Sequence, residues 1–206
     1  LEQTEKLFIE SLFRESIEQK KIPLSPLCQI DKLTGDASTR RYYRIRCEKN
    51  SYVVCLDSPN IISREEYPFW AVHSAYQQGG VRVPNLYDLD LKSGYLLLED
   101  LGDETFLRRL STIKNAQEEL RLYLDCQELS LKIHAIDVRK YEKYQFSKLA
   151  FDKEKLLSEM HFTMKYFVDK FLGCAGKIEE KEAIIEGLTD LCHKIDSQKR
   201  YLVHRD

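Results

Sequence analysis

A change of pattern near residue 103 limits what this chain can fold into more than any other feature. Before it, short segments rich in β-branched and aromatic residues recur at 27–33, 40–47, 51–57, 81–90 and 94–101. After it, apolar residues recur at helical spacing through 103–110, 116–136, 151–173 and 179–195. Strands followed by helices predict an α+β fold and not a chain of alternating parallel units.

Two further helices are predicted within the strand-rich half. One opens the chain at 7–17, and the other, at 58–80, is entered through Ser and Pro residues and closed by a Gly pair. The segments TGDAST and EKN are too short for a crossover helix, so the first three strands are expected to form an antiparallel meander. We expect two lobes, 1–101 with the sheet and 102–206 with helices, joined near 99–102.

Composition excludes several classes of protein. A net charge of -2 provides no overall attraction to nucleic acid or to an anionic membrane. No apolar run approaches the roughly 20 residues that a membrane span needs. The six cysteines are far apart and form no C-x-x-C pair, which favours free thiols in a reducing compartment over a disulfide or zinc framework. A cytoplasmic globular protein is expected, with no indication of its oligomeric state.

Basic residues are concentrated in one place, RRYYRIR, which has four arginines at positions 40, 41, 44 and 46. A solvated strand face is one interpretation, favoured for at least two of the four. The other is a strand that attracts anions beside a phosphate site.

The turn between the first two predicted strands is made of small residues. Backbone N–H groups in such a turn can approach a phosphate closely, and the hydroxyls of Ser38 and Thr39 can add donors. A plain hairpin turn needs Gly and Asp equally, so both interpretations stay open. The candidate phosphate-contacting residues are Gly35, Asp36, Ala37 and Ser38.

The segment that joins the two halves is a second candidate site. An extended connector has backbone N–H and C=O groups that can bind the edge of an adenine, here at Glu99, Asp100 and Leu101. Asp103 follows a glycine directly before a helical pattern, which favours a helix N-cap as its role.

The segment YLVHRD, residues 201–206, provides a candidate base. Phosphoryl transfer needs a carboxylate that accepts or orients the acceptor hydroxyl, and Asp206 can do so. The H-x-D pattern is common by chance. Its position adds weight, because it follows a short apolar segment expected to be a strand and comes after the small-residue turn and the connector.

Taken in order, GDASTRRYYRIR, VVCLDSP, GVRVPNLYDLD, GYLLLEDLGD, FDKEKLLSEMHF and VHRD resemble the aminoglycoside phosphotransferase and choline kinase group of small-molecule kinases. Within this group the chain most resembles the bacterial N-acetylmuramate/N-acetylglucosamine anomeric kinases of cell-wall recycling. The resemblance covers about residues 31–206. It implies a two-lobed, protein-kinase-like fold with an antiparallel-sheet N-lobe and an incomplete helical C-lobe.

The resemblance also implies roles for individual residues. Gly35, Asp36, Ala37 and Ser38 match the phosphate-covering loop, and Glu99, Asp100 and Leu101 match the adenine-binding hinge. Val54 in the third strand is included among the nucleotide-contacting residues. His204 matches the residue that supports the catalytic loop, and Asp206 matches the catalytic base.

Three departures from the kinase pattern are apparent. Leu56 occupies the position at which related kinases carry a phosphate-binding Lys, and we expect Arg41 to offset the phosphate charge instead. The helix Glu that would pair with this Lys has candidates in Glu65 and Glu66, for which a first-turn role beside the helix dipole is favoured. No residues after Asp206 provide the metal-binding Asn and Asp, so no metal ligand is assigned.

The resemblance therefore predicts a kinase that transfers the γ-phosphoryl group of ATP, with Mg²⁺, to a small-molecule hydroxyl. The favoured acceptor is the anomeric hydroxyl of an N-acetylated amino sugar, and the 206 residues alone are expected to be inactive. Other acceptors, namely an aminoglycoside, a choline-like compound or homoserine, remain open. A nucleotide-binding pseudokinase is the alternative outside enzymes.

Overall fold

The computed structural model describes residues 3–24, 26–34, 39–57, 63–64 and 66–204. The chain divides into two compact units, one of Leu1–Ile136 with Val203–Asp206 and one of Asp137–Leu202. Each unit is described by itself. This division lies after the first long helix of the helical half, and the lobe boundary expected between residues 101 and 102 stays a prediction.

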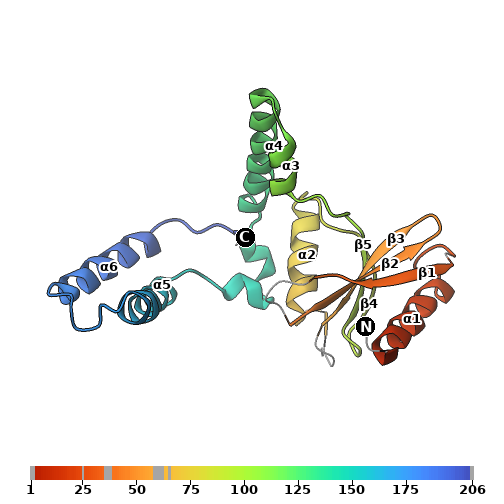
Figure 1. The fold of residues 1–206 in the computed structure, drawn as a ribbon, viewed down its shortest axis with the longest axis horizontal. Helices are drawn as coiled ribbons and strands as arrows, with labels where there is room; N and C mark the ends of the chain where they lie inside the picture. The colour runs from red at the N-terminus through yellow and green to blue at the C-terminus, as the bar shows by residue number, and fades with distance from the viewer. Residues whose placement is uncertain (1–2, 25, 35–38, 58–62, 65, 205–206) are drawn as a thin grey trace. The chain divides into compact units, whose positions relative to one another are not determined.

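The first unit contains a five-stranded antiparallel sheet in the order β1-β2-β3-β5-β4 (Figure 1). The first three strands form the predicted meander, and the combination of this sheet with helices confirms an α+β fold. A kinase-like arrangement of lobes stays a prediction. The strands are β1 (Leu27–Lys32), β2 (Arg41–Cys47), β3 (Ser51–Leu56), β4 (Leu86–Asp90) and β5 (Tyr95–Glu99).

Helix α1 (Gln3–Glu18) covers one face of the sheet. Its apolar side chains recur every four residues, and Ile9 and Phe13 are fully buried against the strands. Strand residues alternate between faces, so every second residue of β3, including Tyr52 and Val54, points into this core. We call this side the α1 face.

Helix α2 (Pro68–Gln78) lies on the opposite side of the sheet (Figure 1). Tyr67 and the residues that follow pack there against Cys55 and Leu98, and we call this side the α2 face. The helix is shorter than predicted because Pro68, with its preset backbone angle, occupies the first turn. Glu66 therefore precedes the helix, which corrects the expected first-turn role, while Glu65 lies outside the described residues.

Two helices follow the connector in the first unit, α3 (Phe106–Thr112) and α4 (Ala116–His134). The N-cap of α3 is Thr105, whose hydroxyl accepts a hydrogen bond from the N–H of Arg108 at 3.2 Å. The expectation that Asp103 caps this helix is therefore wrong.

The second unit is helical throughout its regular segments. It contains 3₁₀ turns at Val138–Tyr141 and Gln145–Lys148, then α5 (Lys153–Phe162) and α6 (Lys181–Asp196). The helix at α5 continues as a π-helix over Thr163–Phe171. An ion pair between Lys181 and Asp169, 2.7 Å from nitrogen to oxygen, joins the start of α6 to this π-helix.

The segment before His204 differs from expectation. Residues 201–204 form no strand, because no described strand lies beside them to accept their backbone hydrogen bonds. The five cysteines with described side chains are free thiols, and two of them, Cys55 and Cys192, are buried. None of the described helices combines the length and the apolar character that crossing a membrane requires.

Candidate functional site

A hollow of about 340 Å³ opens on the α2 face of the sheet, where β5 runs into the connector. This volume lies within the range of small-ligand pockets, roughly 300–1,000 Å³. Apolar and polar side chains both line it: Leu33, Thr34, Arg44, Val53, Pro84, Leu98, Glu99, Asp100, Leu101, Gly102 and Asp103. The hollow thus brings the end of the first strand together with the predicted adenine-binding connector.

Strand register explains why these residues meet. Arg44 of β2 pairs with Val53 of β3, which in turn pairs with Leu98 of β5. Residues paired across antiparallel strands point to the same face, so the three side chains form one row on the α2 face. Residues 99–103 follow directly after this row and form the edge of the hollow.

The charge at the hollow favours a neutral ligand group over an anionic one. Three carboxylates line it, those of Glu99, Asp100 and Asp103, and Arg44 is the one cation among its lining residues in the described part of the chain. A phosphate would meet net repulsion there, whereas an uncharged heterocyclic base would not. The hollow is therefore better suited to an uncharged ligand group than to a phosphate.

The backbone of the connector differs in part from expectation. The N–H of Glu99 donates to the carbonyl of Asn85 at 2.8 Å, and the Glu99 carboxylate binds Arg82 at 2.6 Å. The N–H of Glu99 is thus already used within the sheet edge. Within the described residues, the backbone N–H and C=O of Leu101 have no hydrogen-bond partner, so Leu101 is the better placed of the two to bind a base edge.

Two predicted cofactor-binding residues lie away from the hollow, because neighbours along a strand point to opposite faces. Val54 is fully buried in the core under α1, and its neighbour Val53 lines the hollow instead. Arg41 binds the Glu5 carboxylate of α1 at 2.8 Å, on the α1 face. Leu56, assigned to the missing Lys position, also points into the α1 core.

Asp57 directly follows the last residue of β3. It lies beside Arg40, which directly precedes β2. Its Oδ2 atom accepts hydrogen bonds from Nε of Arg40 at 2.7 Å and from the hydroxyl of Tyr67 at 2.9 Å. Burial and the bond to Asp57 both raise the pKa of Tyr67 above its ordinary range. Asp57 thus belongs to an ion-paired cluster with Arg40.

The four arginines of RRYYRIR are each paired with a carboxylate. Arg40 binds Asp57, Arg41 binds Glu5, Arg44 binds Asp100 and Asp103, and Arg46 binds Asp31. Two of the four, Arg41 and Arg46, are about half exposed, as expected for a solvated strand face. Their pairing argues against a free cationic strand that attracts anions.

The remaining candidates are placed as follows. The ring of His204 stacks on that of Tyr76 in α2, with centroids 6.5 Å apart, and His204 does not line the hollow. Gly35, Asp36, Ala37 and Ser38 lie outside the described residues, as does Asp206. No group of three His, Cys, Asp or Glu side chains that could hold a metal ion occurs in the described part of the chain.

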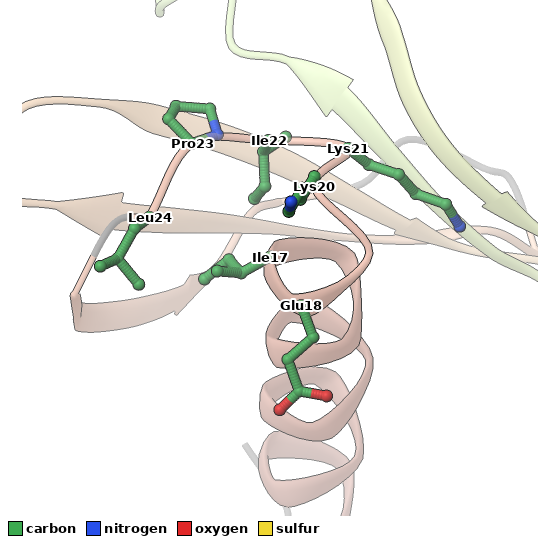
Figure 2. A pocket seen from close by; sticks show the side chains of 7 residues that line it. All are labelled: Ile17, Glu18, Lys20, Lys21, Ile22, Pro23 and Leu24. Atoms are coloured by element: carbon green, nitrogen blue, oxygen red, sulfur yellow. The ribbon is translucent and has the colours of Figure 1, made fainter.

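A second hollow, of about 480 Å³, lies at the turn after α1 and contains none of the predicted site residues. Figure 2 shows the charged end of Lys21 extending away from the apolar Ile17 and Leu24. Lys21 forms an ion pair with Asp88, which also accepts a hydrogen bond from Ser16 at 2.6 Å. This arrangement serves to fasten α1 to the sheet edge.

Sequence reasoning missed the role of Arg44, the most buried of the four strand arginines. Residue alternation carried part of the signal, because it places Arg44 on the same face as Tyr42 and on the opposite face from Arg41. An arginine on a covered strand face requires carboxylate partners, and the acidic connector contains them.

Three named kinases resemble this chain. It is 31% identical over 181 residues to an N-acetylmuramate/N-acetylglucosamine kinase of Pseudomonas aeruginosa, a match that covers 88% of this chain and 50% of the relative. Kinases of the same name from Pseudomonas putida and Neisseria meningitidis serogroup B are 28% and 27% identical, over 88% and 84% of this chain and 50% and 49% of their own.

No protein-family model matches the chain. No solved structure matches it either. The chain spans about half the length of the curated relatives it matches. Over most of its own length, it is similar to bacterial N-acetylmuramate/N-acetylglucosamine kinases.

Proposed function

We propose that the intact protein containing this chain is an ATP-dependent kinase that phosphorylates the anomeric hydroxyl of an N-acetylated amino sugar. The observation that carries the proposal is the similarity to three kinases named for such sugars, which extends over 84–88% of the chain. The hollow beside the connector adds a place of suitable size and charge for the adenine.

In this proposal the nucleotide lies along the α2 face of the sheet. Its base occupies the hollow between Val53, Leu98 and Leu101, with the Leu101 backbone against the base edge. Its phosphates extend away from the carboxylates of the hollow, toward the loop of Gly35, Asp36, Ala37 and Ser38. That loop lies outside the described residues, so its part in the proposal rests on the resemblance.

Asp206 is the proposed general base. Its carboxylate accepts the proton of the anomeric hydroxyl as the hydroxyl oxygen attacks the γ-phosphorus, and ADP leaves. His204 would support the loop that carries Asp206. The described residues contain no metal-ligand set, and the proposal assigns none of them to Mg²⁺.

The test is a phosphorylation assay of the full-length protein against a panel of acceptors. N-acetylmuramate, N-acetylglucosamine, an aminoglycoside, choline and homoserine are each incubated with ATP, with Mg²⁺ or with a chelator. Consumption of ATP with the two amino sugars, and loss of their reducing end, supports the proposal. The matched variant Asp206→Asn should lose at least about 10³-fold in kcat while it still binds ATP.

Two results would contradict this proposal. Phosphorylation of an aminoglycoside, choline or homoserine alone would assign the protein to another acceptor class. Binding of ATP without turnover of any acceptor, equally strong with and without Mg²⁺, would identify a nucleotide-binding pseudokinase.

A further inference from the structure

Arg44 is nearly buried in the middle of β2, with 6% of its surface exposed, and it contacts two carboxylates of the connector. Its Nη1 donates to both oxygens of Asp103 at 2.8 Å. Its Nη2 donates to Oδ1 of Asp100 at 3.0 Å, and its Nε lies 2.8 Å from Oδ2 of the same carboxylate. One guanidinium thus binds both carboxylates at once.

The surroundings of Arg44 and Asp100 favour the charged form of both groups. A buried guanidinium is costly unless a carboxylate compensates its charge, and Arg44 has two such partners. The bonds to Asp100 and Asp103 raise the pKa of Arg44 above its ordinary value. Burial alone would raise the pKa of Asp100, but hydrogen bonds from the Gly102 N–H, Ser51 and Arg44 outweigh it and lower that pKa.

The same contacts determine the path of the connector. Asp100 also accepts a hydrogen bond from the N–H of Gly102 at 3.0 Å, which closes a tight turn around Leu101. Gly102 has a φ of +81°, a conformation that L side chains rarely adopt. Residues on both sides of Leu101 are therefore held, and Leu101, whose own N–H and C=O have no hydrogen-bond partner among the described residues, lies at the edge of the hollow.

We propose that Arg44 is a positioning residue for base recognition: by binding Asp100 and Asp103, it fixes the Leu101 backbone in the orientation that contacts the edge of a purine base. This inference rests on the proposed function, since it assigns the base of ATP to the hollow. It assigns Arg44 no contact with the reacting atoms. Loss of Arg44 therefore weakens ATP binding and lowers the preference for ATP over GTP, and it leaves the rate of phosphoryl transfer unchanged.

The decisive variant is Arg44→Lys in the full-length protein. Lysine keeps the positive charge but cannot bind two carboxylates through a planar fork. We expect the KM for ATP to rise about tenfold and the preference for ATP over GTP to fall about tenfold, which corresponds to losing one charged hydrogen bond. The kcat and the KM for the sugar should stay within about twofold.

Arg46→Lys is the matched control, because Arg46 lies on the same strand and binds the partly exposed Asp31 outside the hollow. It should leave all four quantities unchanged. If Arg44→Lys fails to fold, as judged by circular dichroism, Asp103→Asn decides. Asp103 is 68% exposed on its side chain, so this change should be tolerated while it raises the KM for ATP about threefold and lowers the preference for ATP.

Direct calorimetric binding of ATP, GTP and adenosine separates this inference from the proposed function. A protein that binds ATP, loses base preference in Arg44→Lys and phosphorylates no amino sugar would refute the function and support the role of Arg44. An active sugar kinase whose ATP KM and base preference are unchanged in the decisive variant would overturn the role of Arg44. Absence of ATP binding by the unaltered protein would overturn both.

Discussion

The two faces of the sheet differ, although the same strands form both: one face carries an apolar core and the other borders a hollow. On the α1 face, Ile9 and Phe13 of the helix fill the space above Tyr52 and Val54, and the result is a continuous apolar core. On the α2 face, the helix covers the apolar cluster around Cys55, and the row that contains Val53 is left beside a hollow. Adjacent residues of one strand thus divide between an apolar core and the lining of a hollow.

The charged groups divide in the same way. On the α1 face, Glu5 binds Arg41 at 2.8 Å and accepts a hydrogen bond from Tyr43 at 2.5 Å, which fastens a helix to a strand. On the α2 face, Arg44 binds the connector at the edge of the hollow. Similar ion pairs therefore hold a helix against a strand in one case and a segment at the edge of the hollow in the other.

The largest effect that would test this division is expected from Phe13→Ala. Phe13 is fully buried on the α1 face, so its truncation should lower the free energy of unfolding by about 3–5 kcal/mol. Urea denaturation measures this loss. Phe8→Ala in the same helix is the control, because Phe8 is 41% exposed and should lose less than about 1 kcal/mol. A fall in the ATP affinity of the Phe13→Ala molecules that remain folded would contradict a purely structural role for the α1 face.

Val54→Ala and Val53→Ala sharpen the comparison at two adjacent positions. Val54 is fully buried, so its truncation should cost about 2 kcal/mol of unfolding free energy and leave ATP affinity unchanged. Val53 is half-buried at the hollow, so its truncation should cost less than about 1 kcal/mol and weaken ATP binding about threefold. Urea denaturation and calorimetry of ATP binding measure the two effects, and the opposite pattern would place the ligand on the α1 face.

Glu5→Gln provides the smallest and most specific effect. The hydroxyl of Tyr43 lowers the pKa of Glu5 below its ordinary 4.5, against the opposing effect of burial and with help from Arg41. Burial and the Glu5 carboxylate in turn raise the pKa of Tyr43 to about 12. A lowered carboxyl pKa stabilises the fold fully above pH 4.5, and this contribution disappears as the pH falls through the lowered value.

The variant should therefore unfold more easily than the unaltered protein at neutral pH, by less than about 1 kcal/mol because the pair is partly exposed. The difference should shrink as the pH falls below 4.5. Urea midpoints measured across this range test the expectation. Glu15→Gln, at an exposed position of the same helix, is the control, and an equal pH-dependent difference in it would contradict the role of Glu5.

Sequence patterns predicted the elements of the sheet well and their ends less well. The five strands and the antiparallel meander are confirmed. The helix expected at 58–80 begins only at Pro68, and no strand forms at 201–204. Local pattern reports which conformation a segment favours, whereas the ends of an element depend on proline positions and on neighbours that are distant in sequence.

Part of the lining of the hollow was predicted from the sequence. The connector at residues 99–101 was named from its position between strands and helices, and all three of its residues line the hollow. Val54 and Arg41 were named as well, but they lie on the α1 face, because a shift of one residue along a strand reverses the direction of the side chain. Residue alternation shows which side chains share a face of the sheet. It does not show which of the two faces another part of the fold covers.

The sequence by itself determined the α+β fold and the order of its elements, because hydrophobic periodicity and turn residues act over short stretches of chain. The tertiary structure alone decided which group the carboxylate of Asp103 binds. Its local context, after a glycine and before a helix, favoured an N-cap, but Arg44, distant in sequence, binds it instead. Thr105 caps the helix, so Asp103 stays available to the buried guanidinium, and only the folded sheet brings these two groups together.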